Sequence, residues 1–246
     1  MSVAGTSNER ERLLVVDGLG AGYGGMPALR NVSLEVRRAE IVALVGSNGA
    51  GKTTLLRALS RVIACTGTIS FNNYDLVPMT PDEAFGTGLV QVPEGRQLFD
   101  RMTVMDNLMM GAFRRRDRAA VASDLERMFS LFPRLGERRT QLAGSMSGGE
   151  QQMCAVARGL MARPELLMID EMSLGLAPVV VEQLMDVLQA IRKQDVTVLL
   201  VEQDIHLALS VADRGYVMDT GSIVRSGRGK DLIDDPAVRE AYLGLT

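Results

Sequence analysis

The stretch that decides the fold is GSNGAGKT, residues 46–53. It matches the phosphate-loop pattern, in which four residues separate a glycine from Gly-Lys-Thr. The apolar run IVALV precedes it and TLLRALS follows it, which is the order of a strand, a loop and a helix. A plain glycine-rich turn into a helix would not need lysine and threonine directly after its last glycine. The stretch therefore predicts a site for nucleotide phosphates.

Each type of residue in this loop has an expected role. The glycines let the backbone curl so that its amides face phosphate oxygens at a helix N-terminus. Lys52 is expected to reach the β- and γ-phosphates, and the hydroxyl of Thr53 to bind Mg²⁺. The predicted nucleotide-binding residues of the loop are Gly46, Ser47, Asn48, Gly49, Ala50, Gly51, Lys52, Thr53 and Thr54.

LLMIDE, residues 166–171, supplies a second part of the site. It is an apolar run that ends in two acids, as a buried strand does when it opens into a site. We expect Asp170 to hold Mg²⁺ through water and Glu171 to polarise the water that attacks the γ-phosphate. Two solvated acids at an ordinary strand end are the alternative, which Lys52 makes the weaker one. The Asn-Lys-x-Asp guanine reader of GTPases is absent from the chain.

Composition narrows the class of protein. The chain has 246 residues, and 46% of them are apolar, which is ample for a hydrophobic core. Its net charge of -3 argues against a nucleic-acid partner. Its only cysteines, Cys65 and Cys154, are too few for a disulfide framework or a zinc site, and we expect both to be small buried hydrophobes. The N-terminal residues show no signal peptide, and no eighteen apolar residues run together. A soluble cytoplasmic protein is expected.

Apolar runs alternate with amphipathic segments, which indicates an α/β domain. Unbroken runs at LLMID and VTVLLVE predict buried parallel strands, and the alternation over 32–36 predicts a half-exposed antiparallel strand. Strand signals vanish between about 95 and 145, where we expect helices. The expected strands are Leu13–Asp17, Val32–Val36, Ile41–Val45, Thr68–Phe71, Leu89–Val92, Leu166–Ile169, Val196–Val201, Gly215–Met218 and Ile223–Arg225, and the expected helices begin near Gly51, Val104, Ala119, Gly148, Pro178 and Ile205.

MSGGEQQ, residues 146–152, looks like a second phosphate-holding turn. With the following MCAVARGLMARPELLMIDE it resembles the ATPase subunits of ATP-binding-cassette (ABC) transporters, whose signature, usually Leu-Ser-Gly-Gly-Gln, stands just ahead of the Asp-Glu strand. The resemblance covers essentially the whole chain. It implies one P-loop NTPase (RecA-like) domain over residues 1–246, with an antiparallel β subdomain and a helical subdomain inserted at about 95–160.

The resemblance also explains why one chain carries two phosphate-binding turns. In this family two cassettes pack head to tail, and the signature of each covers the nucleotide on the other. Ser147, Gly148, Gly149 and Glu150 would thus act on ATP held by the partner's phosphate loop. Tyr23 matches the aromatic residue that stacks on adenine, although by residue type alone it could be a turn residue. SLGLAP, residues 173–178, matches the D-loop, which touches the opposite site.

Four positions depart from the family's usual pattern. Glu94 stands where the Q-loop glutamine is usual, and a carboxylate can take over its part in binding Mg²⁺. Gln203 replaces the switch histidine and can still donate a hydrogen bond to the γ-phosphate, but it cannot carry positive charge. The only histidine, His206, is expected on a helix. Met172 replaces a usual proline and is expected to loosen the turn that aims Glu171. Ala177 replaces the usual D-loop aspartate.

Finer motifs are similar to one of the two ATPases of branched-chain (hydrophobic) amino-acid importers: VPEGRQLF, MTVMDNL, FPRLGERR, SGGEQQM, SLGLAP, VEQD and ADRGYVMDTG. Importers of urea or short amides are the rival, and they tend to have glutamine in place of Glu94 and Glu150. A nucleotide-gated module that hardly hydrolyses ATP, suggested by Gln203 and Met172, and a soluble repair or cluster-assembly ATPase stay open. A repair ATPase would need a long coiled-coil insertion for which the chain has no room.

The partners implied by the resemblance are ATP, a second identical or homologous cassette, transmembrane permease subunits and a solute-binding protein acting through the permease. The implied location is the cytoplasmic face of the cell membrane. The 95–145 helices and the loop of Glu94 would dock on a cytoplasmic helix of the permease.

Overall fold

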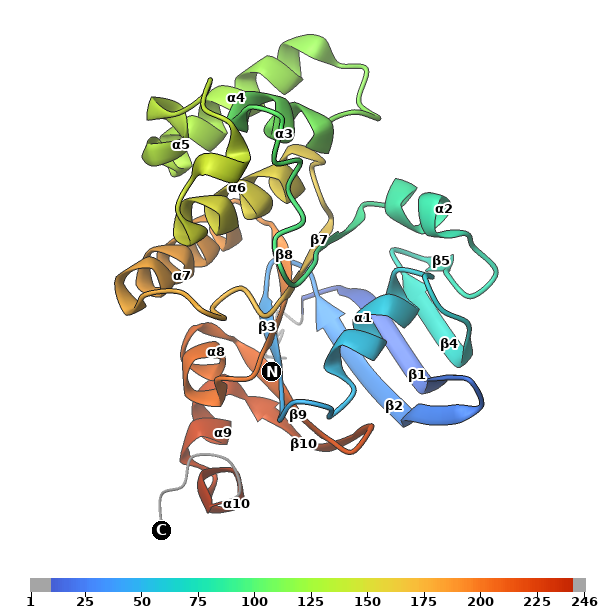
Figure 1. Cartoon of the computed structure of the whole chain (residues 1–246). Coiled ribbons are helices and arrows are strands. Elements are labelled where there is room, and N and C mark those ends of the chain that lie inside the picture. Colours follow the sequence, from blue (N-terminus) through green and yellow to red (C-terminus); the bar gives the residue numbers. More distant parts are fainter. Residues whose placement is uncertain (1–9, 241–246) are drawn as a thin grey trace, which may run out of the picture.

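The structure, a computed structural model, describes residues 10–240. Within them the chain forms two sheets and ten α-helices, with one short 3₁₀ helix (Figure 1). The expectation that no signal peptide begins the chain concerns residues that lie partly outside this range. The end of the C-terminal tail also lies outside this range, and its described part forms two short helices, α9 (Gly229–Asp234) and α10 (Pro236–Val238).

The first sheet is antiparallel, with the strand order β2-β1-β4-β5. Its strands are β1 (Arg12–Tyr23), β2 (Met26–Arg37), β4 (Cys65–Phe71) and β5 (Tyr74–Asp75). Val16 on β1 pairs with Leu34 on β2 and with Ile69 on β4, and all three side chains are buried. Because side chains alternate along a strand, this register gives the sheet one apolar face, and the predicted alternation over 32–36 is confirmed.

The second sheet has six strands in the order β10-β9-β3-β8-β7-β6. They are β3 (Ile41–Val45), β6 (Leu89–Val92), β7 (Leu166–Asp170), β8 (Thr197–Glu202), β9 (Arg214–Asp219) and β10 (Ser222–Arg228). All neighbours are parallel except the edge pair of β9 and β10. Every residue of β3, β7 and β8 is buried, so the predicted buried parallel strands are confirmed.

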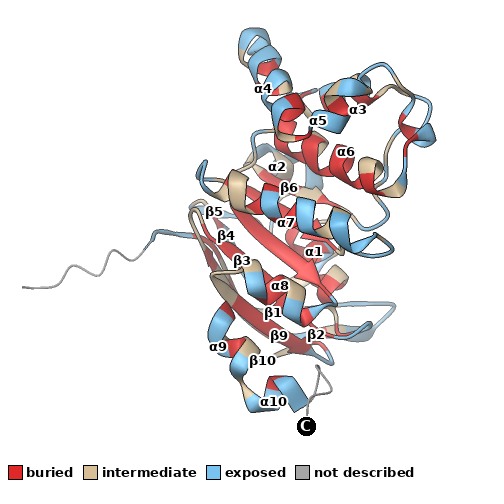
Figure 2. Ribbon diagram, turned by 90° about the vertical axis from the view of Figure 1, so that its left-hand side faces the viewer, coloured by how far each residue is buried: buried red, intermediate tan, exposed pale blue. Residues whose placement is uncertain are grey.

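The six-stranded sheet separates two hydrophobic clusters (Figure 2). Ile41 and Val45 on β3 belong to the cluster that α6, α7 and α8 complete. Val42 and Leu44 belong to the other, which includes α1 and the antiparallel sheet. Side chains of the single strand β3 thus belong to both hydrophobic clusters, as expected for a sheet that is covered on two faces.

The helices fall into two groups (Figure 1). The helices that flank the strands of the sheets are α1 (Lys52–Leu59), α2 (Pro81–Gly86), α7 (Pro178–Arg192), α8 (Ile205–Val211), α9 and α10. The second group lies together at one end of the molecule and consists of α3 (Val104–Gly111), α4 (Arg118–Leu131), α5 (Pro133–Glu137), η1 (Ala143–Ser145) and α6 (Gly148–Met161). No helix among residues 10–240 is long and apolar enough to cross a membrane.

The two cysteines differ from the prediction in one respect. Cys154 on α6 is fully buried, and burial raises the pKa of its thiol to about 12. Cys65 begins an edge-facing part of β4, is only half-buried, and accepts a hydrogen bond from Arg61 at 2.9 Å. The expectation that both are buried hydrophobes is therefore wrong for Cys65, which packs against a core cluster but is only half-buried and has a guanidinium beside its thiol.

Candidate functional site

The phosphate loop joins the end of β3 to the first turn of α1. Gly51 has φ +109°, in the left-handed region that favours glycine, and its carbonyl accepts the first hydrogen bond of α1 from Leu55 at 2.9 Å. A Cβ on Gly46 would lie 2.2 Å from the carbonyl oxygen of Met218, so no larger residue fits there. Ala50 folds back on Ser47, whose carbonyl accepts from its amide at 3.1 Å. The conformation of the loop is therefore set by its own glycines and backbone hydrogen bonds.

Lys52 points back over this loop. Its Nζ donates to the carbonyls of Gly46 at 2.8 Å and Ser47 at 3.2 Å, and the side chain is only 4% exposed. The same Nζ lies 3.2 Å from Oε1 of Glu171, whose side chain is 10% exposed. The structure therefore joins the two halves of the predicted site, the loop and the end of β7, through one ion pair in a shielded place.

Glu171 follows β7 in an unusual backbone conformation. Its φ is +46°, which non-glycine residues seldom adopt. Its amide donates to the carbonyl of Val201 at 2.9 Å, so it continues the ladder between β7 and β8. Met172, directly after it, is 1% exposed and belongs to the core with α7 and α8. The expectation that Met172 loosens this turn stays a prediction.

Thr53 and Asp170 meet between α1 and β7. The hydroxyl of Thr53 lies 3.5 Å from Oδ1 of Asp170. The pKa of Asp170 is raised to about 6, mainly by burial and also by the nearby charges of Glu171 and Glu94, while the bond from Thr53 opposes this rise. Glu94 is exposed and comes directly after Pro93, in the loop that leaves β6. Asp170 therefore stands in a field that favours a neighbouring cation.

The donors fit Mg²⁺ in kind. A hydroxyl and two carboxylates are oxygen ligands, which Mg²⁺ prefers, and this ion takes its remaining ligands from water and phosphate. Within residues 10–240 no three His, Cys, Asp or Glu side chains form a metal cage. A metal here would therefore depend on a nucleotide for part of its ligand shell, as in phosphate-loop enzymes.

Two adjoining hollows share Thr53 and Glu94 as walls. One has a volume of about 360 Å³ and includes Asn48, Gly49, Gly51, Lys52, Thr54 and Glu171 in its lining. The other has a volume of about 390 Å³ and includes Arg57, Gln91 and Asp170. The structure thus brings most of the predicted nucleotide-binding residues and three predicted acids to one place.

Tyr23 ends β1 beside α1. Its hydroxyl accepts a hydrogen bond from Arg57 at 3.3 Å, and its side chain is 43% exposed. Burial raises the pKa of Tyr23, but hydrogen bonds with Thr54 and Arg57 outweigh burial and lower this pKa below its ordinary value. The ring therefore stands next to the hollow that holds Thr54, with area left for a planar base to stack on.

The second turn is a helix cap. The hydroxyl of Ser147 accepts from the amide of Glu150 at 3.3 Å, and the carboxylate of Glu150 accepts from the Ser147 amide at 3.0 Å, so the two form a capping box at the start of α6. Burial raises the pKa of Glu150, but the bonds with Ser147 and the charge of Arg138, 2.9 Å away, outweigh burial and lower this pKa. Gly149 is buried and packs so closely on α7 that a Cβ there would lie 2.7 Å from the side chain of Val180.

Although the turn is well formed, it does not join the hollows of its own chain. Neither lining includes any of residues 147–150, which all lie within the described part. Ser147 is exposed and Gly148 half-exposed. The molecule therefore has two phosphate-type turns that do not share a pocket, and the second one faces outward.

Gln203 and His206 follow β8. Gln203 is exposed at the strand end, and the carboxylate of Asp204 then caps α8 by accepting from the Leu207 amide at 2.9 Å. His206 is exposed on α8, so the expectation of a helical histidine is confirmed. Because β8 lies between β3 and β7, Gln203 emerges at the same edge as the phosphate loop and Glu171.

One buried polar side chain of this region was not predicted. Glu202, the last residue of β8, is 1% exposed and accepts from the amide of Ser173 at 3.1 Å and from its hydroxyl at 2.7 Å. Burial raises the pKa of Glu202 to about 7. Its only sequence signal is an acid that closes the apolar run VTVLLVE, a pattern typical of an ordinary strand end.

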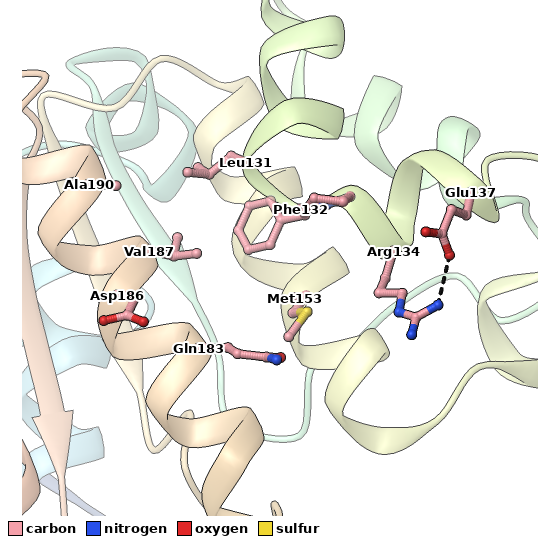
Figure 3. A pocket seen from close by; sticks show the side chains of 10 residues that line it. Leu131, Phe132, Arg134, Glu137, Met153, Gln183, Asp186, Val187 and Ala190 are labelled. Carbon is pink, nitrogen blue, oxygen red and sulfur yellow. Dashed lines mark hydrogen bonds and ion pairs between the residues drawn. The ribbon is translucent and has the colours of Figure 1, made fainter.

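A separate cavity of about 450 Å³ lies between α5, α6 and α7 (Figure 3). Leu131, Phe132, Met153 and Val187 form its apolar wall. An ion pair of 2.9 Å between Arg134 and Glu137 closes one side of it. None of the predicted nucleotide-binding residues lines this cavity.

With this geometry in view, residues 29–173 match the model of the ABC transporter family. The chain is 45% identical to the high-affinity branched-chain amino acid transport ATP-binding protein BraG of Pseudomonas aeruginosa, over 94% of this chain and all of that one. It is 32% identical to LivG of Escherichia coli, a protein of the same description, over 94% of this chain and 98% of that one.

Solved structures agree. A nucleotide-free ATP-binding cassette of an ABC transporter superposes with a TM-score of 0.81 at 26% identity, covering 94% of this chain and 98% of that one. The ADP conformation of the cassette MJ1267 gives 0.81 at 26% identity over 95% and 99%. The molecule is thus an ATP-binding cassette of the phosphate-loop class. It belongs to the ABC transporter family, as its ATPase component, and the expected fold class is confirmed.

Proposed function

We propose that this chain hydrolyses Mg·ATP at the interface of two cassettes and thereby powers the import of branched-chain amino acids across the cell membrane. The observation that carries this proposal is the separation of the two turns. Lys52 and Glu171 meet in one shielded pocket, whereas Ser147 faces outward from the same chain. Two chains packed head to tail would bring the turns together over shared nucleotide.

In this reading the hollow beside Thr53 receives the triphosphate. Lys52 exchanges its contact with Glu171 for the β- and γ-phosphates, since a phosphate carries more negative charge than one carboxylate. Tyr23 stacks on the base and the amides of residues 46–54 surround the phosphates. Thr53, Asp170 and Glu94 hold Mg²⁺, which neutralises charge on the phosphate oxygens when bound.

Release of Glu171 from Lys52 frees its carboxylate to act as the general base. It takes the proton of the attacking water, and Gln203 donates a hydrogen bond to the γ-phosphate. Ser147 and the amides at the start of α6 in the second cassette supply the remaining contacts, because a helix N-terminus favours an anion. Glu150 supports that turn by holding Ser147 in the capping box.

We assign the helices α3–α6, at about 95–160, to a subdomain that meets the permease. A groove between this group and the loop after β6 is lined by Gln97, Phe99, Met110 and Phe113 among others. Phe99 is 47% and Phe113 is 65% exposed, which is unusual for large apolar residues unless a partner covers them. A cytoplasmic helix of a transmembrane subunit fits this groove in kind. The chain then works at the cytoplasmic face of the membrane.

The likeness to BraG and LivG supports branched-chain amino acids as the solute, delivered by a solute-binding protein through the permease. Urea or short amides are the competing cargo. The test is uptake by vesicles that contain this chain, a homologous cassette, two permease subunits and a solute-binding protein. ATP-driven uptake of leucine but not urea is expected. Uptake of urea alone would mean that the solute is urea and not a branched-chain amino acid. ATP binding without turnover would favour the nucleotide-gated module.

A further inference from the structure

The segment directly after the general base is held at two points. Glu171 has φ +46°, a conformation that persists only where the surroundings over-determine it. On one side its amide is tied to the carbonyl of Val201. Two residues later, Ser173 is tied to the carboxylate of Glu202 through both its amide and its hydroxyl, at 3.1 and 2.7 Å. Both ties come from the last two residues of β8.

Glu202 is an unusual choice for this place. Its side chain is 1% exposed, and it lies next to the negative charges of Glu171 and Asp204, which together with burial work against its ionisation. An apolar residue would finish the buried strand with none of this penalty, since Val201 and Leu200 already do so. What an apolar residue could not do is accept two hydrogen bonds from Ser173.

The same strand end carries Gln203. Val201 and Glu202 are the last two residues of β8 and Gln203 follows them directly, so the anchors of the 171–173 turn lie next to the residue assigned to the γ-phosphate. β8 is paired on both sides, by β3 and β7, and every residue of it is buried. A displacement of Ser173 would therefore move Glu171 relative to the end of β8.

We propose that Glu202 is a positioning residue for ATP hydrolysis, which holds Ser173 and thereby aims the carboxylate of Glu171 at the attacking water. This inference rests on the proposed function of Glu171 as general base. In this proposal Ser173 is also the residue through which the D-loop, residues 173–178, is hydrogen-bonded to the central sheet. Neither residue touches the nucleotide hollows, whose linings contain neither of them.

The test compares Ser173→Ala, Ser173→Thr and Glu202→Gln in the pair of cassettes that hydrolyses ATP. Loss of the anchor should lower kcat by about 10- to 10²-fold, the range expected when a catalytic group is displaced by about 1 Å. The KM for ATP and the ATP Kd should change less than about twofold, because Lys52 and the loop are untouched. Ser173→Thr keeps the hydroxyl and should keep most of the rate.

A matched control is Glu40→Gln. Glu40 is also a buried carboxylate, 2% exposed, and accepts from the Arg37 amide at 2.7 Å, but it lies before β3 at the opposite end of the sheet. Its variant should lower the melting temperature without lowering kcat. The Ser173 and Glu202 variants should instead lower kcat even at temperatures well below their melting transitions.

The decisive readout uses the Glu171→Gln background. If Ser173 acts by aiming Glu171, then Ser173→Ala should have no further effect on the residual rate once the base is gone. A further loss of tenfold or more in that background would overturn the proposal, as would an unchanged kcat in Ser173→Ala and Glu202→Gln with wild-type turnover intact. A wild-type pair that binds ATP and shows no turnover would instead contradict the proposed function and remove the basis of this inference with it.

Discussion

Nζ of Lys52 lies 3.2 Å from Oε1 of Glu171, and both side chains are almost fully shielded from water. The residue assigned to the phosphates and the residue assigned to the water thus neutralise each other. In the proposed function a nucleotide phosphate competes with Glu171 for the lysine, so we expect ATP binding to release the base. The proposed function thus predicts that occupancy of the loop is coupled to readiness for hydrolysis.

Lys52→Ala should abolish ATP binding and leave the fold intact. The loop loses its only side-chain cation, while its backbone is set by glycines and by β3. Glu171 would be left without its partner, so we expect a loss of about 3 kcal/mol in the free energy of unfolding. Titration with a fluorescent ATP analogue checks the affinity, circular dichroism checks the fold, and Lys193→Ala, an exposed lysine at the end of α7, is the control. Unchanged ATP affinity would remove the phosphate-loop assignment.

Gln203→Ala should lower ATP turnover, whereas His206→Ala should leave it nearly unchanged. Gln203 stands at the edge of the sheet where Glu171 emerges, but His206 is exposed on α8. Loss of one hydrogen bond to the transferred phosphate is expected to slow kcat by about 10-fold. Steady-state phosphate release measures both variants, and a large loss from the His206 change alone would mean that the strand end has been misread.

Asp170 predicts a pH dependence of stability. Its pKa is raised to about 6 in the fold, against about 3.9 in an unfolded chain, so the folded state disfavours the charged carboxylate. The penalty is absent below pH 4, grows as the pH rises to about 6, and is complete above that value. Asp170→Asn should therefore stabilise the nucleotide-free protein by roughly 2 to 3 kcal/mol at pH 8 and by almost nothing at pH 4. Urea unfolding at the two pH values measures it; equal stabilisation at both would contradict the assigned environment.

Much of this fold follows from local sequence. Nine strands were expected and all nine are present. Unbroken apolar runs such as LLMID were the clearest signal, because such a run is typical of a strand buried on both faces. The strand β5 was missed, since two exposed residues, Tyr74 and Asp75, carry no periodicity. The helix α2 was missed as well, although Thr80 and Glu83 form a capping box at its start, a signal that the sequence did contain.

The contacts within the site were less accessible. The motifs placed Lys52 and Glu171 in one site, but their ion pair depends on the order of strands in the sheet, which brings β3 and β7 to either side of β8. The tie between Glu202 and Ser173 joins residues 29 positions apart and depends on the register of β7 against β8. No local pattern encodes such a register, so Glu202 looked like an ordinary strand end.

The central claim is that the turn at Ser147 completes a nucleotide site on another chain. It is tested in Glu171→Gln, which should bind Mg·ATP and turn it over about 10²- to 10⁴-fold more slowly because an amide cannot take the proton of water. The trapped nucleotide should hold two cassettes together, so the homologous partner belongs in the experiment.

Sedimentation with and without Mg·ATP then compares Glu171→Gln with the same chain carrying Ser147→Arg as well. Ser147 is exposed and lines neither hollow of its own chain, so the arginine should leave nucleotide binding intact, which equilibrium dialysis verifies. The account predicts an ATP-dependent dimer for the single variant and its loss in the double variant. An undiminished ATP-dependent dimer in the double variant would contradict it.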